Sequence, residues 1–139
     1  MKFTRSGGIL LHPSCLPGDY GIGDLGPNSY RFIDWLSGSG CKLWQILPLG
    51  HTGYGDSPYQ CFSAFAGNPF LISLEFLLND GLLSRADLEQ KPDFPAGRVN
   101  FGLLIPWKLS LLELAFNRFY ESESLDFCEK FAVFRAENS

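Results

Sequence analysis

The stretch Gly8-Ile9-Leu10-Leu11-His12, taken together with Leu43-Trp44-Gln45-Ile46-Leu47, decides the fold class of this 139-residue chain. Each stretch is a brief apolar run without helical period, which is typical of a strand covered on both faces. The two strands are separated by a glycine- and proline-rich loop and a helical pattern. A strand, a helix and a second strand in this order form a βαβ unit with parallel strands and a right-handed crossover. The sequence therefore predicts an α/β fold.

The connecting helix is expected to begin at Pro27, because proline suits the first helical position, where its missing N–H needs no partner. Gly38 and Gly40 mark the end of this helix. Its predicted apolar face consists of Phe32, Ile33 and Leu36.

The second half of the chain is predicted to be mainly helical. Residues 71–83 indicate a turn-like or short helical connection, and residues 92–106, with three prolines and two glycines, indicate a loop. Residues 107–120 and 126–136 have the pattern of amphipathic helices. The apolar face of the first of these helices is predicted to consist of Leu112, Phe116 and Phe119. One βαβ unit followed by helices closes no sheet, so we expect an architecture that is cut off.

Composition excludes several classes of function. The net charge is −4, the pI is near 5.0 and the Lys and Arg residues are scattered, which argues against nucleic acid as a partner. No apolar run has the length of a signal-peptide core or a membrane span, so we expect no membrane partner and a cytoplasmic location. The four cysteines, which have no zinc-ligand spacing with His12 or His51, are expected to be reduced thiols in small apolar sites: Cys15, Cys41, Cys61 and Cys128.

The loop after the second strand carries the candidate site. In barrels of parallel strands, the loops that follow the strands build the active face. Here a glycine and proline frame holds two tyrosines with acidic, hydroxyl and amide side chains. Such rings stack on sugars while the polar groups bind hydroxyls. The alternative is a loop whose polar side chains only satisfy its own backbone. The residues concerned are Tyr54, Asp56, Ser57, Tyr59 and Gln60.

Three segments of the chain resemble the opening of the amylomaltase family, which comprises the 4-α-glucanotransferases of glycoside hydrolase family 77. They are residues 8–26, residues 43–60, which include Asp56-Ser57-Pro58-Tyr59-Gln60, and residues 62–72. A weaker similarity continues through residues 98–104 and Trp107-Lys108. Family members are several times longer, so the chain would be their N-terminal part.

The resemblance implies the start of a (β/α)8 TIM barrel with an inserted helical subdomain, truncated after about the first two strands. Residues 1–70 would be the first βαβ unit of the barrel with its active-face loops. Residues 71–139 would be connecting loops and helices of the inserted subdomain, incomplete at the C-terminus.

The resemblance also implies site roles. Tyr59 matches the tyrosine that stacks on the sugar beside the cleaved bond, and Ser57 belongs to the same donor-site wall. Tyr54 matches an aromatic residue of the glucan-binding surface, and Asp56 is assigned to shaping the loop. The chain departs from the family at Cys15 and Cys61, where serine is common. It departs again where proline is frequent, at His51, which we expect to be solvated.

The implied reaction transfers α-1,4-glucan segments between maltooligosaccharides, amylose or starch. A retaining mechanism needs two carboxyl groups and neither an organic cofactor nor a metal. None of the fifteen acidic residues stands in a matching context, so no catalytic residue is assigned and both carboxylates are expected beyond Ser139. Two alternatives stay open, which are a non-catalytic glucan-binding module and an inactive remnant without a ligand.

Overall fold

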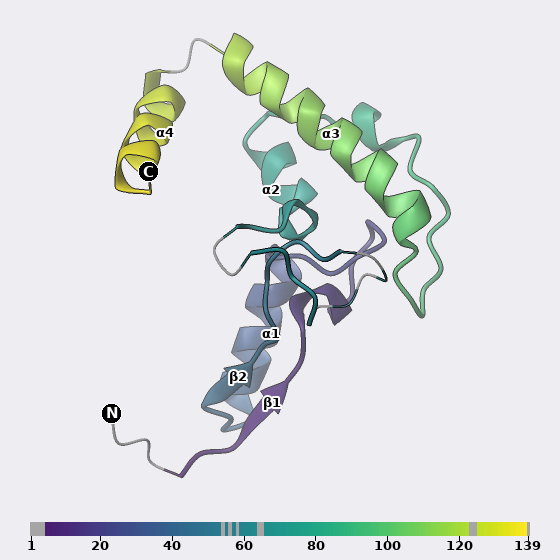
Figure 1. Ribbon diagram of the computed structural model, residues 1–139, viewed down its shortest axis with the longest axis vertical. Coiled ribbons are helices and arrows are strands. Elements are labelled where there is room, and N and C mark those ends of the chain that lie inside the picture. The colour runs from purple at the N-terminus through teal and green to yellow at the C-terminus, as the bar shows by residue number, and fades with distance from the viewer. Residues whose placement is uncertain are drawn as a thin grey trace.

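The computed structural model describes residues 5–53, 55, 57, 59–63, 66–122 and 125–138, the side chains of residues 125–127 excepted. The helices and strands along the chain are β1 (Gly8–Leu10), α1 (Pro27–Gly38), β2 (Leu43–Gln45), α2 (Leu74–Asn79), α3 (Phe101–Glu121) and α4 (Leu125–Glu137) (Figure 1). Three single 3₁₀ turns lie between them, η1 (Pro13–Cys15), η2 (Pro69–Leu71) and η3 (Ala86–Leu88).

The predicted βαβ unit is present. β1 and β2 pair in parallel, with Gly8 opposite Leu43 and Leu10 opposite Gln45. The strands approach so closely at Gly8 that a Cβ atom there would lie 2.5 Å from the Leu43 carbonyl oxygen, so glycine is required. α1 begins at Pro27, as predicted, and runs beside the strand pair (Figure 1). This unit therefore sets the direction in which the loop after β2 leaves.

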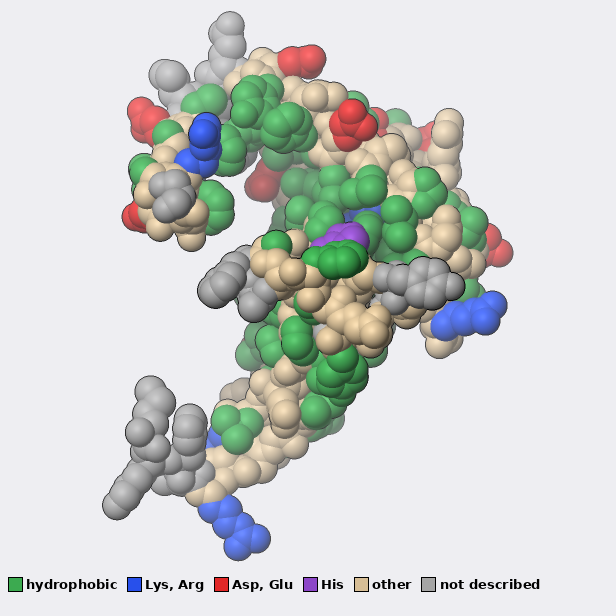
Figure 2. Space-filling model, viewed as in Figure 1, with side chains coloured by type: hydrophobic (Ala, Val, Ile, Leu, Met, Phe, Trp, Pro, Cys, Tyr) green, Lys and Arg blue, Asp and Glu red, His purple; other side chains and the backbone are tan. Residues whose placement is uncertain are grey.

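The predicted burial of this unit is wrong in two respects. The strands have three residues each, and Leu10 and Leu43 are 55% and 48% exposed. On α1, Leu36 is buried, but Ile33 is 47% exposed. The physical reason is that in the described part of the chain the sheet has two strands and α1 alone runs beside them. Hydrophobic side chains consequently lie on the surface around this unit (Figure 2).

The main hydrophobic core lies between the first loop, α2 and α3. Tyr20 comes from the loop after β1, and its hydroxyl donates a hydrogen bond to Glu75 of α2. Burial, reinforced by the neighbouring Glu75 carboxylate, raises the pKa of Tyr20 to about 12. A second, smaller cluster joins Ile22, Phe70 and Leu104. The buried members of the main cluster are Tyr20, Leu74, Leu83, Leu88, Leu111 and Ala115.

α3 differs from its prediction in both its start and its buried face. It begins at Phe101, where the Asn100 side chain caps it by accepting a hydrogen bond from Leu103 N–H, and it continues through Pro106. Of the predicted face Leu112, Phe116 and Phe119, Phe116 is 54% exposed and contradicts the prediction, whereas Leu112 packs against the main core cluster. The buried stripe is shifted by one residue and consists of Leu104, Lys108, Leu111 and Ala115.

α2 confirms the short helical connection predicted within residues 71–83. For residues 126–136, an amphipathic helix was predicted, and only the helix is confirmed. The last segment is a helix, but it is not amphipathic, since Val133 and Phe134 are 56% and 60% exposed. Phe131 makes an edge contact with Phe119 of α3, with ring centroids 5.6 Å apart. Figure 1 shows α4 beside the C-terminal end of α3, away from the strand pair. None of the helices in the described ranges is long and apolar enough to cross a membrane.

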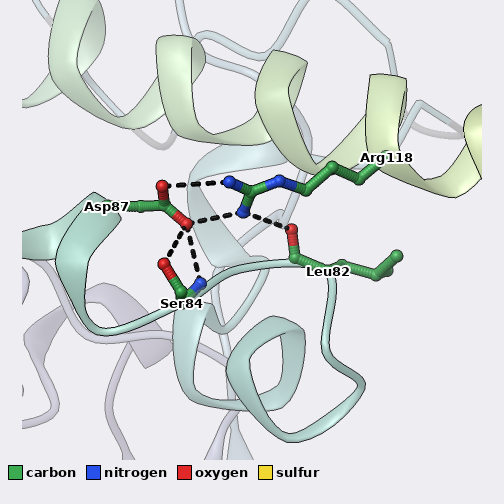
Figure 3. A network of polar contacts seen from close by, with 4 residues as sticks. All are labelled: Leu82, Ser84, Asp87 and Arg118. Atoms are coloured by element: carbon green, nitrogen blue, oxygen red, sulfur yellow. Dashed lines mark hydrogen bonds and ion pairs between the residues drawn. The ribbon is translucent and has the colours of Figure 1, made fainter.

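An ion pair ties the turn η3 to α3 (Figure 3). Arg118 donates hydrogen bonds to both carboxylate oxygens of Asp87, at 2.5 and 3.1 Å, and to the Leu82 carbonyl at 3.2 Å. The backbone N–H and the hydroxyl of Ser84 donate to the same carboxylate, at 2.7 and 2.8 Å. Arg118, followed by the Ser84 hydrogen bonds, holds the pKa of Asp87 well below its usual range.

We expect Arg118→Gln to lower the melting temperature at neutral pH and to lose this effect in acid. A lowered folded-state pKa means that Asp87 contributes stability above its ordinary pKa of about 3.9, and that this stability is lost as the pH falls further. The difference between wild type and variant should therefore shrink below about pH 4. Arg31→Gln is the matched control, because Arg31 is exposed and its guanidinium donates a hydrogen bond to Asn28 on the same helix. Calorimetry at several pH values measures both, and a difference that stays constant into strong acid would contradict the assignment.

Candidate functional site

The loop after β2 folds into a short antiparallel hairpin. Thr52 and Cys61 form a β-bridge, Phe62 N–H donates to the His51 carbonyl at 3.2 Å, and Gly53 N–H donates to the Gln60 carbonyl at 3.2 Å. These bonds close the base of the hairpin, so that Gly55, Ser57 and Tyr59, the described residues between the two, lie at its tip. We call residues 51–62 the glucan-loop hairpin, after the sugar-binding role that the sequence predicts for it.

Ser57 and Tyr59 lie together at this tip. Tyr59 is 74% exposed, so its ring is open to a ligand. Ser57 accepts hydrogen bonds on its carbonyl from Gln60 N–H at 2.9 Å and on its hydroxyl from Tyr59 N–H at 3.4 Å. The Ser57 hydroxyl therefore contacts its own loop. Tyr54 and Asp56 lie outside the described residues, and their predicted roles stay predictions.

An aromatic group supports the base of the hairpin. The ring of His51 stacks on Phe62 with centroids 6.2 Å apart and lies 5.5 Å from the ring of Phe70. His51 is half-buried, so this loop histidine is less solvated than expected. The neighbouring rings replace water around the imidazole. Phe62 itself is 79% exposed and provides a second open ring that the sequence analysis did not single out.

The cysteines are unlinked by disulfides, but they do not all fill apolar sites. Cys15 and Cys128 are exposed, which contradicts that expectation, whereas Cys41 and Cys61 are half-buried. In the hairpin, the Cys61 thiol lies 3.4 Å from the Gly50 carbonyl, to which it donates. The Cys61 side chain thus faces the backbone just before the hairpin.

A buried charge lies behind the hairpin, and sequence reasoning missed it. Lys108 is 0% exposed, and its ammonium donates a hydrogen bond to the Phe70 carbonyl at 2.7 Å. Burial, partly offset by the nearby Asp24 carboxylate, lowers the pKa of Lys108 to about 8. Burial likewise raises the pKa of Asp24, against the influence of Lys108 and of the hydrogen bond from Gly26 N–H. The available signal was a lysine inside the apolar stripe of a helix.

A cavity of about 760 Å³ lies between residues 14–23 and residues 91–99. Its charged lining includes Asp19, Lys91, Asp93 and Arg98. Ser57 and Tyr59, the predicted site residues that the structure describes, are not among its lining residues. Among the described residues, no group of three or more His, Cys, Asp or Glu residues could hold a metal ion.

Comparisons with known proteins identify the family of this chain. A family model described as 4-alpha-glucanotransferase matches residues 11–139. The 4-alpha-glucanotransferase of Thermus thermophilus is 51% identical over 97% of this chain and 26% of its own length. The chloroplastic/amyloplastic 4-alpha-glucanotransferase of Solanum tuberosum is 48% identical over 86% of this chain and 21% of its own length.

The structural comparison points the same way. Amylomaltase from Streptococcus agalactiae, solved in complex with acarbose, superposes with a TM-score of 0.88 at 38% identity. The match covers 96% of this chain and 27% of that chain. The chain thus spans about a quarter of the length of the curated relatives it matches. Because the family model matches most of the chain and these relatives are so similar to it, the chain belongs to the 4-alpha-glucanotransferase family.

Proposed function

We propose that the protein carrying this segment is a 4-α-glucanotransferase that moves α-1,4-glucan segments between maltooligosaccharides or starch-type glucans. The segment supplies donor-site binding residues. The observation that carries this proposal is the open ring of Tyr59 at the tip of the hairpin that follows a parallel strand. Family membership supports the reaction, and the acarbose complex of the solved amylomaltase supports a ligand of the same class.

The segment is proposed to be the start of a (β/α)8 barrel. Residues 1–70 would form its first βαβ unit with the active-face loops, and residues 71–139 would belong to an inserted helical subdomain. Two observations support the start of a larger barrel. The chain covers about a quarter of its relatives, and the apolar side chains of Leu10 and Leu43 are exposed where further strands and helices would cover them. We further propose that this enzyme works in the cytoplasm, although the potato relative is chloroplastic/amyloplastic.

The proposed chemistry is a retaining double displacement. One carboxylate attacks the anomeric carbon while a second carboxyl group protonates the departing glycosidic oxygen, which leaves a covalent glycosyl intermediate. The second group then takes the proton from the 4-hydroxyl of an acceptor glucan, whose oxygen displaces the first carboxylate. We place both carboxylates outside these 139 residues. Tyr59 would stack on the donor sugar, Ser57 would stand in the same wall, and Tyr54 and Asp56 keep their predicted roles in glucan binding and loop shape.

The test compares the purified 139-residue chain with the full-length enzyme on maltotriose. We expect the full-length enzyme to release glucose and longer oligomers, and the chain alone to release neither, because both carboxylates are absent. Transfer by the chain alone would overturn the proposed placement of the carboxylates. A full-length protein that binds maltotriose without transfer would instead support the glucan-binding module.

A further inference from the structure

Lys108 occupies a position where a charge is costly. It lies on α3 between Leu104 and Leu111 in the buried stripe, and it is 0% exposed. Removing an ammonium from water is unfavourable unless it finds close partners, and an apolar side chain of similar volume often serves stability equally well. Filling space on α3 therefore does not require a lysine here. The feature that an apolar side chain lacks is the directional hydrogen bond to the Phe70 carbonyl.

That hydrogen bond holds the backbone at Phe70, eight residues after the glucan-loop hairpin. The Phe70 carbonyl accepts from Lys108 at 2.7 Å, and the Phe70 N–H donates to the Asn68 side chain at 2.9 Å. Both backbone groups of Phe70 are therefore held, and its side chain is 3% exposed. Asp24, from the loop after β1, supplies the opposite charge near Lys108.

From Phe70 the contact continues into the hairpin itself. The Phe70 ring lies 5.5 Å from the His51 ring, and the His51 carbonyl accepts the hydrogen bond from Phe62 N–H that closes the hairpin base. His51 also stacks on Phe62. A displacement of Phe70 would therefore be transmitted to the base of the hairpin whose tip carries Tyr59.

We propose that Lys108 is a positioning residue for glucan transfer, which acts through Phe70 and His51 to hold the hairpin that presents Tyr59. This inference rests on the proposed donor-site role of Tyr59. It predicts that Lys108 matters for transfer only as long as the Tyr59 ring is present, because the lysine itself touches no substrate.

The experiment is a double-mutant cycle in the full-length enzyme, with maltotriose as substrate. Lys108→Met removes the ammonium but keeps the length of the side chain. Misplaced substrate-contacting groups can cost up to about a hundredfold, and we expect kcat/KM to fall about tenfold in the wild-type background. In a Tyr59→Ala background, the same change should alter kcat/KM less than about twofold, because no ring is left to position.

Lys91→Met is the matched control. Lys91 also donates to a backbone carbonyl, that of Asp19 at 2.9 Å, but it is exposed and contacts no hairpin residue that the structure records. Its kcat/KM should match wild type. If Lys108→Met fails to fold, Phe70→Leu serves instead, since it keeps the carbonyl but removes the ring contact with His51. Phe70→Leu should likewise lower kcat/KM when Tyr59 is present and have little effect in the Tyr59→Ala background.

The outcomes separate this inference from the proposed function. If Tyr59→Ala leaves kcat/KM unchanged, the donor-site role of Tyr59 is wrong. If Tyr59→Ala lowers kcat/KM but Lys108→Met lowers it equally in both backgrounds, or in neither, the positioning role alone is wrong. A loss that disappears in the Tyr59→Ala background supports both.

Discussion

Tyr59→Ala in the full-length enzyme should lower kcat as well as weaken glucan binding. The transition state of glycosyl transfer resembles an oxocarbenium ion, so positive charge develops on the donor sugar ring. This sugar ring faces the π-system of the tyrosine. Stacking should therefore be stronger in the transition state than in the ground state, which is the condition for an effect on kcat. The expected loss is on the order of 1–3 kcal/mol, extrapolated from the range of cation–π energies. The 74% exposure of Tyr59 leaves its ring open for this contact.

Three companion variants make the result specific. Tyr59→Phe keeps the ring and should lose clearly less, and Tyr54→Ala should mainly impair the use of long glucans. Tyr30→Ala is the control, because Tyr30 is 59% exposed but lies on α1. The measurement is kcat and KM on maltotriose and on amylose. If Tyr59→Ala changed KM alone, the assignment of Tyr59 to the reacting sugar would be wrong. It would also be wrong if Tyr54→Ala lowered kcat/KM on maltotriose more than Tyr59→Ala does.

Leu74→Ala should be the most damaging of the proposed changes to the fold. Leu74 begins α2, is 0% exposed and belongs to the main core cluster with Tyr20 and Leu111. Truncating a fully buried leucine removes its transfer free energy and leaves a cavity, which together cost about 2–5 kcal/mol of unfolding free energy. Urea unfolding followed by tryptophan fluorescence measures the change, with Trp107 packed against the same cluster as the reporter.

The control for Leu74 is Leu25→Ala, because Leu25 is 45% exposed. Its loss should be below about 1 kcal/mol, as is usual away from the core. Equal losses for the two variants would show that the cluster around Leu74 does not carry the stability of this region. A changed denaturant slope for either variant would mean that the exposed area on unfolding, and not only the stability, had changed.

The parts of the fold that were predictable depend on local signals. Pro27 marks the start of α1 because its ring suits the first helical turn, and the two apolar runs pair as expected. The start of α3 was missed because Pro106 suggested a loop, whereas tertiary packing of Leu104 and the Asn100 cap offset the missing hydrogen bond. The exposure of the strands depends on which other strands and helices pack against them, and a local sequence pattern does not contain this information.

The sequence predicted which loop carries the candidate site residues, but not the contacts that support this loop. A glycine-rich loop with tyrosines after a strand indicated Ser57 and Tyr59, which the structure brings together at the hairpin tip. The contacts of His51 with Phe62 and Phe70 join residues that the sequence separates, so spacing alone could not reveal them. Lys108 was hidden for a further reason, since a lysine in a helix is normally read as solvent-exposed.

The composition of the main core has a consequence for synthesis of the chain on the ribosome. Tyr20, in the loop after β1, packs in one cluster with Leu111 and Ala115 of α3. A nascent chain stalled before α3 has emerged thus contains Tyr20 without these partners, and the loop after β1 stays open to proteolysis. Protection of that loop should arise only when α3 clears the exit tunnel, so the loop after β1 is completed by one of the last helices described here.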